Sequence, residues 1–234
     1  MGLTKYKEKR HFDETPEPSG KKKSTKRGAL KFVIQKHAAS HLHYDFRLEM
    51  DGVLKSWAIP KGPSLNPEDK RLAMAVEDHP YDYKDFEGII PEGNYGAGTV
   101  IVWDEGTYEP LDHEDKPIKE QEKILLSEFY KGDLKIVLHG KKLKGAFALV
   151  QMKSRGENAW LLIKKKDEFV EKKDITEDDK SVKSGRRLEE IASDKKSKTW
   201  KSNRKSSTSS AAKSKTVKKK SSRLKTSSRV TKKL

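Results

Sequence analysis

Polar and apolar residues alternate without a break from His41 to Met50. A period of two is typical of a β-strand with one buried face, so this segment predicts a half-buried strand whose polar side chains share one face. Asp51-Gly52 then separates it from a second apolar alternation, and this dipeptide predicts a tight hairpin into a strand over 53–59. A shorter apolar alternation over 30–34 indicates a neighbouring strand.

Six further segments have the short apolar runs and flanking turn residues that are typical of strands: 71–77, 99–103, 106–109, 134–138, 145–152 and 159–164. Turns are expected at 104–106 and 155–158. Apolar residues on one side predict a helix over 117–130, and a second short helix is expected at 186–192. Together these elements predict a mainly β fold, a small closed or nearly closed β-barrel of about eight strands with one or two short helices.

The net charge of the chain is +16, and nearly all of the excess lies in residues 193–234. This segment holds 16 Lys and Arg residues, one acidic residue and almost no large apolar residues. Because it buries too little surface to offset its ordering entropy, we predict a disordered basic tail. Such tails typically bind polyanions through phosphate contacts. A solubilising extension without a partner is the alternative.

The N-terminal stretch over 1–28 is also polar, and we predict an arm that partly wraps the domain. Residues 29–192 are numerous enough for one sizeable core and form the predicted barrel domain. The chain has no cysteine, which excludes disulfides and thiolate metal sites and favours a reducing compartment. Because no apolar run approaches the roughly 18 residues of a membrane span and no signal-peptide core is present, we expect a cytoplasmic protein.

Histidines cluster at one place in the chain. Three of the seven fall within seven positions, at His37, His41 and His43, and Asp45 and Arg47 follow. On a strand, His43 and Asp45 would lie on one face, roughly 6.6 Å apart at Cα. That spacing lets both side chains reach one divalent cation, and a guanidinium one step further suits a phosphate that bridges to the cation. The pattern predicts a metal-assisted phosphoryl site.

Other interpretations of this cluster are a solvated polar face or a structural site without chemistry. His37 precedes the strand and would have to approach from the end of a neighbouring strand. Two imidazoles and one carboxylate with open positions suit manganese, iron or zinc better than calcium, which prefers oxygen ligands. The pattern does not choose among these metals. His41 shares the strand face, and we expect its side chain to be exposed to solvent.

The same segment carries a resemblance to a known family. F-V-I-Q-K-H-A-A-S-H-L-H-Y-D-F-R-L-E, followed by D-G-V-L-K-S-W-A-I-P-K-G-P-S, resembles the 3'-phosphoesterase domain of bacterial DNA ligase D, which also occurs as a stand-alone protein. The similarity continues through A-V-E-D-H-P-Y-D-Y-K-D-F-E-G, I-P-E-G-N-Y-G-A-G-T-V and W-D-E-G-T-Y. It resumes at W-L-L-I-K and S-V-K-S-G-R, and so covers roughly residues 10–192. Several blocks in the same order are more specific than one motif.

The resemblance implies a β-barrel fold, in agreement with the strand pattern, and a role for each matching residue. It implies that the Mn2+ ligands are His37, His43 and Asp45, and that the catalytic residues are Arg47, His79 and Tyr83.

Three further residues would contact substrate phosphate or DNA by resemblance, namely Lys61, Arg71 and Glu17. As bare residues, Lys61 and Arg71 are ordinary surface cations. Glu17 matches an acidic residue of the family's N-terminal arm. Members commonly carry a second acid where this chain has His11, so the contribution of the arm stays open.

By resemblance, the expected function is that of a manganese-dependent 3'-phosphodiesterase and phosphomonoesterase. It would remove 3'-terminal ribonucleosides and 3'-phosphates from primer-template ends and leave 3'-OH ends for repair. The chain is too short to add polymerase and ligase domains, so we expect a nucleoid-associated monomer that serves separate ligase, polymerase or end-binding partners. The alternative is a non-catalytic DNA-binding or scaffold protein of an end-joining complex. Loss of a ligand residue would favour that alternative, and none is lost.

Overall fold

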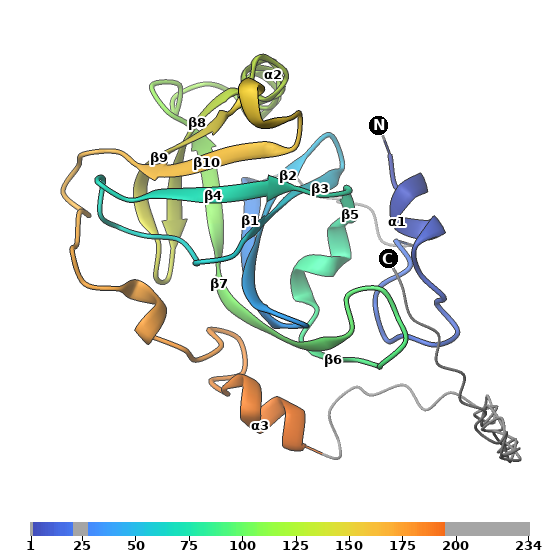
Figure 1. Ribbon diagram of the computed structural model, residues 1–234. Helices are drawn as coiled ribbons and strands as arrows, with labels where there is room; N and C mark the ends of the chain where they lie inside the picture. Colours follow the sequence, from blue (N-terminus) through green and yellow to red (C-terminus); the bar gives the residue numbers. More distant parts are fainter. Residues whose placement is uncertain (1, 21–27, 195–234) are drawn as a thin grey trace, which may run out of the picture. The chain divides into compact units, whose positions relative to one another are not determined.

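The computed structural model describes residues 2–20 and 28–194, which are built around one β-sheet (Figure 1). Of the tail predicted over 193–234, residues 195–234 lie outside the described residues. The strands are β1 (Leu30–Ala38), β2 (Leu42–Met50), β3 (Val53–Ile59), β4 (Lys70–Ala75), β5 (His79–Pro80), β6 (Gly88–Ile90), β7 (Gly98–Pro110), β8 (Asp133–Gly140), β9 (Lys144–Gln151) and β10 (Ala159–Lys164).

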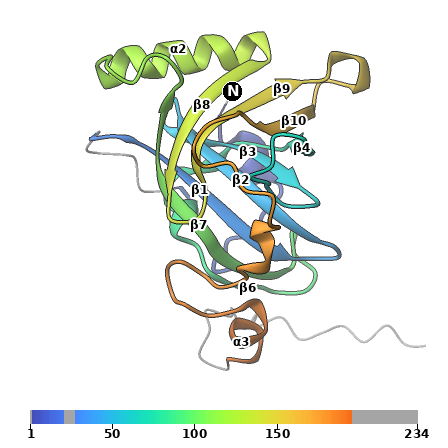
Figure 2. The same ribbon diagram turned by 90° about the vertical axis from the view of Figure 1, so that its left-hand side faces the viewer.

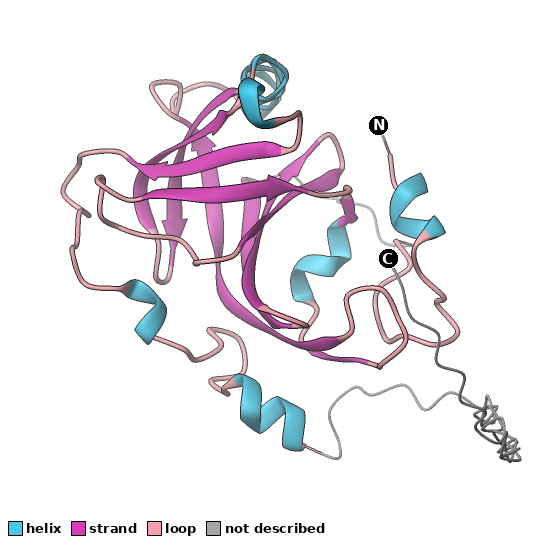
Figure 3. Ribbon diagram, in the orientation of Figure 1, coloured by secondary structure: helices cyan, strands magenta, loops and turns pink. Residues whose placement is uncertain are grey.

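The strands form one antiparallel sheet that closes on itself. Their order is β1-β2-β3-β4-β10-β9-β8-β7-β6, with β5 paired to β3. β1 pairs with β7 as well as with β2, and this contact joins eight strands into a closed barrel, seen as magenta arrows in Figure 3. The predicted fold class is confirmed.

The helical elements are few and short apart from one. They are α1 (Thr4–Glu8), α2 (Ile118–Lys131), α3 (Leu188–Ser193) and the 3-10 helices η1 (Tyr81–Asp85), η2 (Lys153–Arg155) and η3 (Ile175–Glu177). The helices predicted at 117–130 and 186–192 therefore both exist, each within two residues of its expected bounds. α2 ends because Gly132 adopts a left-handed φ of 79° and its N–H reaches the carbonyls of Glu128 and Phe129.

The hairpin between β2 and β3 has the predicted geometry. Asp51 and Gly52 both have positive φ angles, 53° and 74°, as a two-residue turn that follows the strand twist requires. The hairpin keeps the register in which Asp45 pairs with Ala58 and Arg47 with Ser56. This register fixes which β2 side chains face the barrel interior.

One predicted turn is wrong. Residues 99–103 and 106–109 belong to a single strand, β7, and no turn separates them at 104–106. Instead the register of the pairing with β1 shifts by one residue at this point. Ile34 lies opposite Asp104, whereas the next residue, Gln35, lies opposite Val102. The Asp104 carboxylate is fully buried and accepts backbone N–H groups from 141–143 at 2.8–3.1 Å. Asp104 therefore stabilises the turn between β8 and β9 and does not form a turn within β7.

The barrel interior is apolar apart from the buried Lys164 of β10, and α2 covers one end of it (Figure 2). Phe129 of α2 stacks on Trp160 with ring centroids 5.7 Å apart and contacts Trp57 at 5.9 Å. β2 contributes every second side chain to this core, namely Tyr44, Phe46, Leu48 and Met50.

The opposite face of β2 is also buried, which corrects the expected half-buried strand. From Tyr44 to Met50 every β2 residue is buried. The N-terminal arm and η1 cover the outer face of the barrel there, around a second apolar cluster that includes Tyr6, Leu54 and Tyr83. In Figure 1 α1 and η1 lie on the same side of the barrel as β5. Periodicity identified the two faces correctly, but it could not show that a distant segment covers the polar one.

The last described residues pack against the outside of the barrel. Leu188 and Ile191 of α3 form a small apolar cluster with Ile101 of β7. In the part of the chain that the structure describes, no helix has the length and apolar character needed to cross a membrane.

Candidate metal and phosphate site

The predicted ligand residues meet on the outer face of the β1–β2 pair. His37 of β1 lies directly opposite His43 of β2 in the strand register, as expected for a residue that approaches from a neighbouring strand. His37 Nδ1 is 3.5 Å from one Asp45 oxygen, and His43 Nε2 is 3.7 Å from the other. One ligand atom from each of the three residues lies within 4.8 Å of the other two. These residues form a group that could hold one metal ion.

Backbone carbonyls orient both imidazoles toward this shared point. His37 Nε2 donates to the carbonyl of Gly96 at 2.9 Å, and His43 Nδ1 donates to the carbonyl of His41 at 2.9 Å. Because a carbonyl only accepts, each of these ring nitrogens carries the proton. The other nitrogen of each ring faces Asp45 and is the one that a metal ion would bind. His41 itself is exposed, as expected.

Arg47 lies beside the carboxylate that the two histidines face. Its Nη2 donates to Asp45 Oδ2 at 3.1 Å and its Nε donates to Gln35 Oε1 at 2.8 Å, while the buried Nη1 has no partner. Burial disfavours the Asp45 carboxylate, but the charge of Arg47 and the adjacent His37 outweigh it, and the pKa of Asp45 lies below its ordinary value. Asp45 is thus anionic at neutral pH, as a metal ligand would be, and the Nη1 amino group of Arg47 is left without a partner.

His79 is held as a neutral imidazole. Its Nδ1 donates to the carbonyl of Glu77 at 2.9 Å, and its Nε2 accepts from Arg10 Nη2 at 3.2 Å. Burial, together with the charges of Arg47 and Arg10, lowers the pKa of His79 well below its ordinary value. His79 therefore presents an acceptor nitrogen rather than a cation.

Tyr83 and Glu17 connect this layer to the N-terminal arm. The Tyr83 ring lies 4.9 Å from the Arg47 guanidinium, and its hydroxyl donates to Glu17 Oε1 at 2.9 Å. Glu17 also accepts from Arg10 Nε at 2.8 Å. Burial and the nearby carboxylate of Glu17 raise the pKa of Tyr83 well above its ordinary value, so its hydroxyl stays protonated. The structure thus places Glu17, His79 and Tyr83 in one layer with Arg47.

Comparison with known proteins assigns a family to this arrangement. A profile of the family described as "DNA Ligase D 3'-phosphoesterase domain" matches residues 35–151, which span β1 to β9. The chain belongs to this family. The three candidate metal ligands, Arg47 and His79 all lie within the matched residues, whereas Glu17 lies before them. The resemblance noted in the sequence is thereby confirmed.

The curated relatives of this chain are much longer proteins. The "Multifunctional non-homologous end joining protein LigD" of Pseudomonas aeruginosa is 52% identical over 167 residues, which are 70% of this chain and 19% of that protein. The "Multifunctional non-homologous end joining DNA repair protein LigD" of Mycobacterium tuberculosis is 42% identical over 168 residues, 72% of this chain and 21% of that protein. This chain therefore spans about one fifth of the length of these curated relatives.

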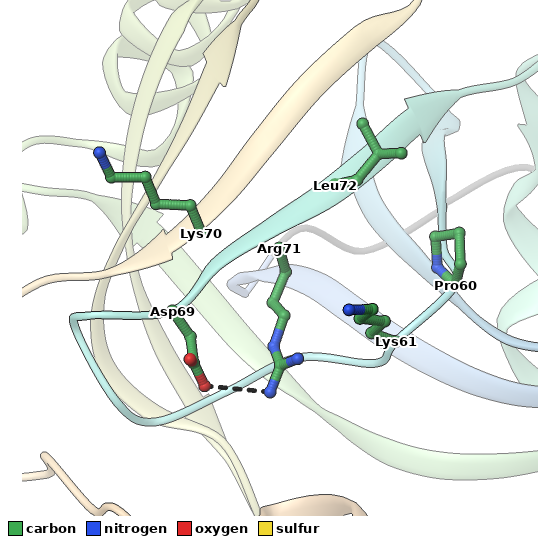
Figure 4. A pocket seen from close by; sticks show the side chains of 6 residues that line it. All are labelled: Pro60, Lys61, Asp69, Lys70, Arg71 and Leu72. Atoms are coloured by element: carbon green, nitrogen blue, oxygen red, sulfur yellow. Dashed lines mark hydrogen bonds and ion pairs between the residues drawn. The ribbon is translucent and has the colours of Figure 1, made fainter.

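Two of the predicted phosphate contacts lie elsewhere on this chain. Lys61 and Arg71 line a pocket of about 350 Å³ at the ends of β3 and β4, with Pro60, Asp69, Lys70 and Leu72 (Figure 4). Arg71 Nη2 forms an ion pair with Asp69 at 3.0 Å, while its buried Nε has no partner. Among the described residues, neither cation makes a hydrogen bond or ion pair with the candidate metal ligands. The pocket is a second basic site on the same domain.

Sequence reasoning missed the residues that hold the site in place. Gln35 is fully buried, accepts from Arg47 and donates to the carbonyls of Tyr83 and Phe86 at 3.0 and 2.9 Å. Arg10 joins Glu17, Glu77 and His79 from the arm. Gln35 is two residues before His37 on the same strand face, so the alternation could have identified it. Nothing local to the sequence pointed to Arg10.

Proposed function

We propose that this protein is a manganese-dependent phosphoesterase that heals DNA 3' ends, removing 3'-terminal ribonucleosides and 3'-phosphates to leave 3'-OH groups. One observation carries the proposal. Arg47 binds Asp45 through Nη2, while its Nη1 has no partner. Arg47 can therefore bind a phosphate oxygen through Nη1 next to a metal ion that is held by Asp45. Family membership supports DNA 3' ends as the class of substrate.

The donor set suits a divalent transition ion. Two imidazole nitrogens and one carboxylate oxygen, with remaining positions open to water or substrate, favour manganese, iron or zinc over calcium. Such an ion would polarise the bound phosphate as a Lewis acid. The choice of manganese among these metals rests on the resemblance to the family.

The residues around the phosphate have separate tasks in this proposal. Arg47 neutralises charge that develops on the phosphate oxygens. His79 orients or protonates a reacting oxygen, once substrate competes with Arg10 for its Nε2. By resemblance Tyr83 would contact the phosphate. Its hydroxyl donates to Glu17 and its ring lies 4.9 Å from the Arg47 guanidinium, so we propose that it also positions Arg47. Glu17 thereby links the arm to catalysis, and Lys61 and Arg71 offer secondary phosphate contacts from their pocket.

The reaction has two hydrolytic steps. In the first, water attacks phosphorus and the bond to the 5' oxygen of the terminal ribonucleoside breaks, which leaves a 3'-phosphate. In the second, water attacks that phosphate and the bond to the 3' oxygen breaks, which leaves a 3'-OH and inorganic phosphate. A separate polymerase or ligase could then use the end, and we propose such proteins as partners.

The test uses two labelled primer-templates, one with a 3'-phosphate and one with a 3'-terminal ribonucleotide, incubated with and without manganese. We expect metal-dependent conversion of both to 3'-OH ends. His43→Ala removes one of only three ligands and should lower both rates at least about 1,000-fold. His41→Ala, on the exposed neighbour, is the matched control and should keep the wild-type rate. DNA binding without conversion under any divalent metal would favour the scaffold alternative.

A further inference from the structure

An exposed tyrosine lies beside the metal ligands without a role in the site described above. Tyr95, in the loop between β6 and β7, is 49% exposed. In Figure 1 this loop lies next to the N-terminal arm, which supplies Arg10 to the site. Isolated exposed aromatic residues are common on protein surfaces and carry no meaning by themselves. The surroundings of Tyr95 distinguish it from them.

The loop that presents Tyr95 is fastened to a metal ligand. Its backbone forms two consecutive turns, Asn94 N–H to the carbonyl of Pro91 at 3.3 Å and Ala97 N–H to the carbonyl of Asn94 at 3.1 Å. The carbonyl of Gly96, the residue after Tyr95, accepts a hydrogen bond from His37 Nε2. Tyr95 is therefore adjacent in sequence to the group that orients His37, and its backbone is fixed relative to the metal site.

Two cations of the arm contact the Tyr95 ring. Lys9 Nζ lies 4.6 Å from the ring centroid and donates to the hydroxyl at 3.3 Å, and the Arg10 guanidinium lies 5.5 Å from the centroid. The same Arg10 donates to His79 Nε2. The ring thus contacts the arginine that binds His79, and the residue after Tyr95 accepts from His37. The ring is held by cations, and about half of the residue still faces solvent.

We propose that Tyr95 is a stacking platform for the base of a nucleotide that flanks the reacting phosphate. This inference rests on the proposed function and names a residue that selects nucleotide substrates over other phosphoesters. A flat ring suits any of the four bases, because every base has a π-face. Lys9 and Arg10 beside it are already paired with Glu77 at 3.0 and 3.1 Å, so the platform acts through its ring and not through a local positive charge. The phosphate is held by Arg47 and the metal ligands, so the platform acts on substrate affinity and not on bond cleavage.

The decisive measurement is the division of the effect between KM and kcat. Tyr95→Ala should raise KM for both labelled primer-templates about 5- to 150-fold, the range of base-aromatic stacking, with kcat near that of wild type. Tyr95→Leu, which keeps bulk without a π-face, should behave like the alanine variant. Tyr95→Phe should retain the wild-type KM. Tyr130→Ala, which removes a tyrosine that is 62% exposed on α2, is the matched control and should have no effect.

Abasic nucleotides identify the base that stacks. Wild-type protein should lose affinity for a substrate that is abasic at the stacked position, and Tyr95→Ala should show no further loss there. A defect with both substrates assigns the base on the 5' side of the phosphate. A defect with the 3'-ribonucleotide substrate alone assigns the leaving nucleoside.

The inference and the proposed function can fail separately. An unchanged KM in Tyr95→Ala, or an equal fall in kcat in Tyr95→Ala and Tyr95→Phe, would overturn the platform while leaving the phosphoesterase intact. If the wild-type protein converts neither substrate, the proposed function fails. The binding affinities of the same variants for 3'-phosphate DNA then decide whether the ring stacks.

Discussion

The two faces of β2 are both buried, yet they are organised in different ways. Phe46 and Leu48 point into the barrel among apolar side chains, whereas Asp45 and Arg47 point outward into a layer of ion pairs and hydrogen bonds. Dispersion and hydrophobic contacts inside the barrel have no strict direction, so many apolar residues of similar size would fit there. Each outward polar group instead needs a specific partner at a specific place.

This contrast separates stability from chemistry within one strand. The inner face buries large side chains, and its contribution is measured as free energy of unfolding. The outer face gains less, because each of its hydrogen bonds replaces one with water and its charges lose solvation. What the outer face retains is an oriented carboxylate, an oriented imidazole that lies opposite His37 of β1, and an arginine whose Nη1 has no partner.

The largest expected effect comes from the inner face. Phe46→Ala removes a fully buried ring that contacts Phe32 and Trp57, and should lower the free energy of unfolding by about 3–5 kcal/mol. Urea unfolding monitored by tryptophan fluorescence measures this loss. At a temperature where the variant is still folded, the rate per folded molecule should match wild type, because no site residue is altered.

A matched substitution on the outer face tests the other half of the comparison. Glu49→Gln keeps the shape of a buried side chain and retains an oxygen for the Lys31 N–H that Glu49 Oε2 accepts at 3.0 Å. It should cost less than about 1 kcal/mol. Equal destabilisation by Phe46→Ala and Glu49→Gln would contradict the distinction between the faces. A Phe46→Ala protein that is folded but has no catalytic activity would contradict it as well.

Local patterns predicted what local forces determine. The β2–β3 hairpin, the strand at 159–164 and the α2 helix follow from periodicity and turn residues alone. The pairing of His37 with His43 was also accessible, since a strand that ends before a short turn lies beside the next one. For the same reason, alternation correctly placed Asp45 and Arg47 on one face.

Contacts between distant segments could not be predicted in this way. The Asp104 carboxylate binds N–H groups 37 to 39 residues further along the chain, so its local neighbourhood looked like a turn. Arg10 reaches His79 across 69 residues, and nothing near Arg10 in the sequence indicates that contact. The sequence predicted an arm that partly wraps the domain, but not that this arm would cover the polar face of β2.

The next effect in size separates geometry from charge on the outer face. Arg47→Lys keeps one positive charge, but a single ammonium cannot bind Gln35, Asp45 and a phosphate oxygen in the planar arrangement of the guanidinium. We expect kcat to fall about 100-fold, or roughly 2.7 kcal/mol, measured by single-turnover cleavage of the 3'-phosphate substrate. Arg155→Lys, on an exposed arginine of η2, should be unchanged. Near wild-type turnover in Arg47→Lys would show that charge alone is sufficient.

A smaller effect than that of Arg47→Lys is a pH dependence of stability that originates at His79. Burial and the charges of Arg47 and Arg10 lower its pKa in the folded protein, whereas the unfolded chain has a pKa of about 6.5. Below that pH the unfolded state takes up a proton that the folded state resists. Stability should therefore be lost as pH falls below about 6.5, by at most about 1.4 kcal/mol per pH unit from this residue, and should not depend on His79 at higher pH.

Urea unfolding of metal-free protein between about pH 5 and pH 8 measures this dependence, with His79→Gln as the comparison. Glutamine offers Arg10 an acceptor oxygen in place of Nε2 but does not titrate. The difference between the two stability curves isolates His79, because the other titrating groups contribute to both. Asp45 and Glu77, whose pKa values are lowered, act at more acidic pH and are also common to both proteins. If the curves run parallel from pH 8 to pH 5, the imidazole is not held neutral by the outer layer, and that layer is more open to water than the contacts of His79 with Arg10 and Glu77 imply.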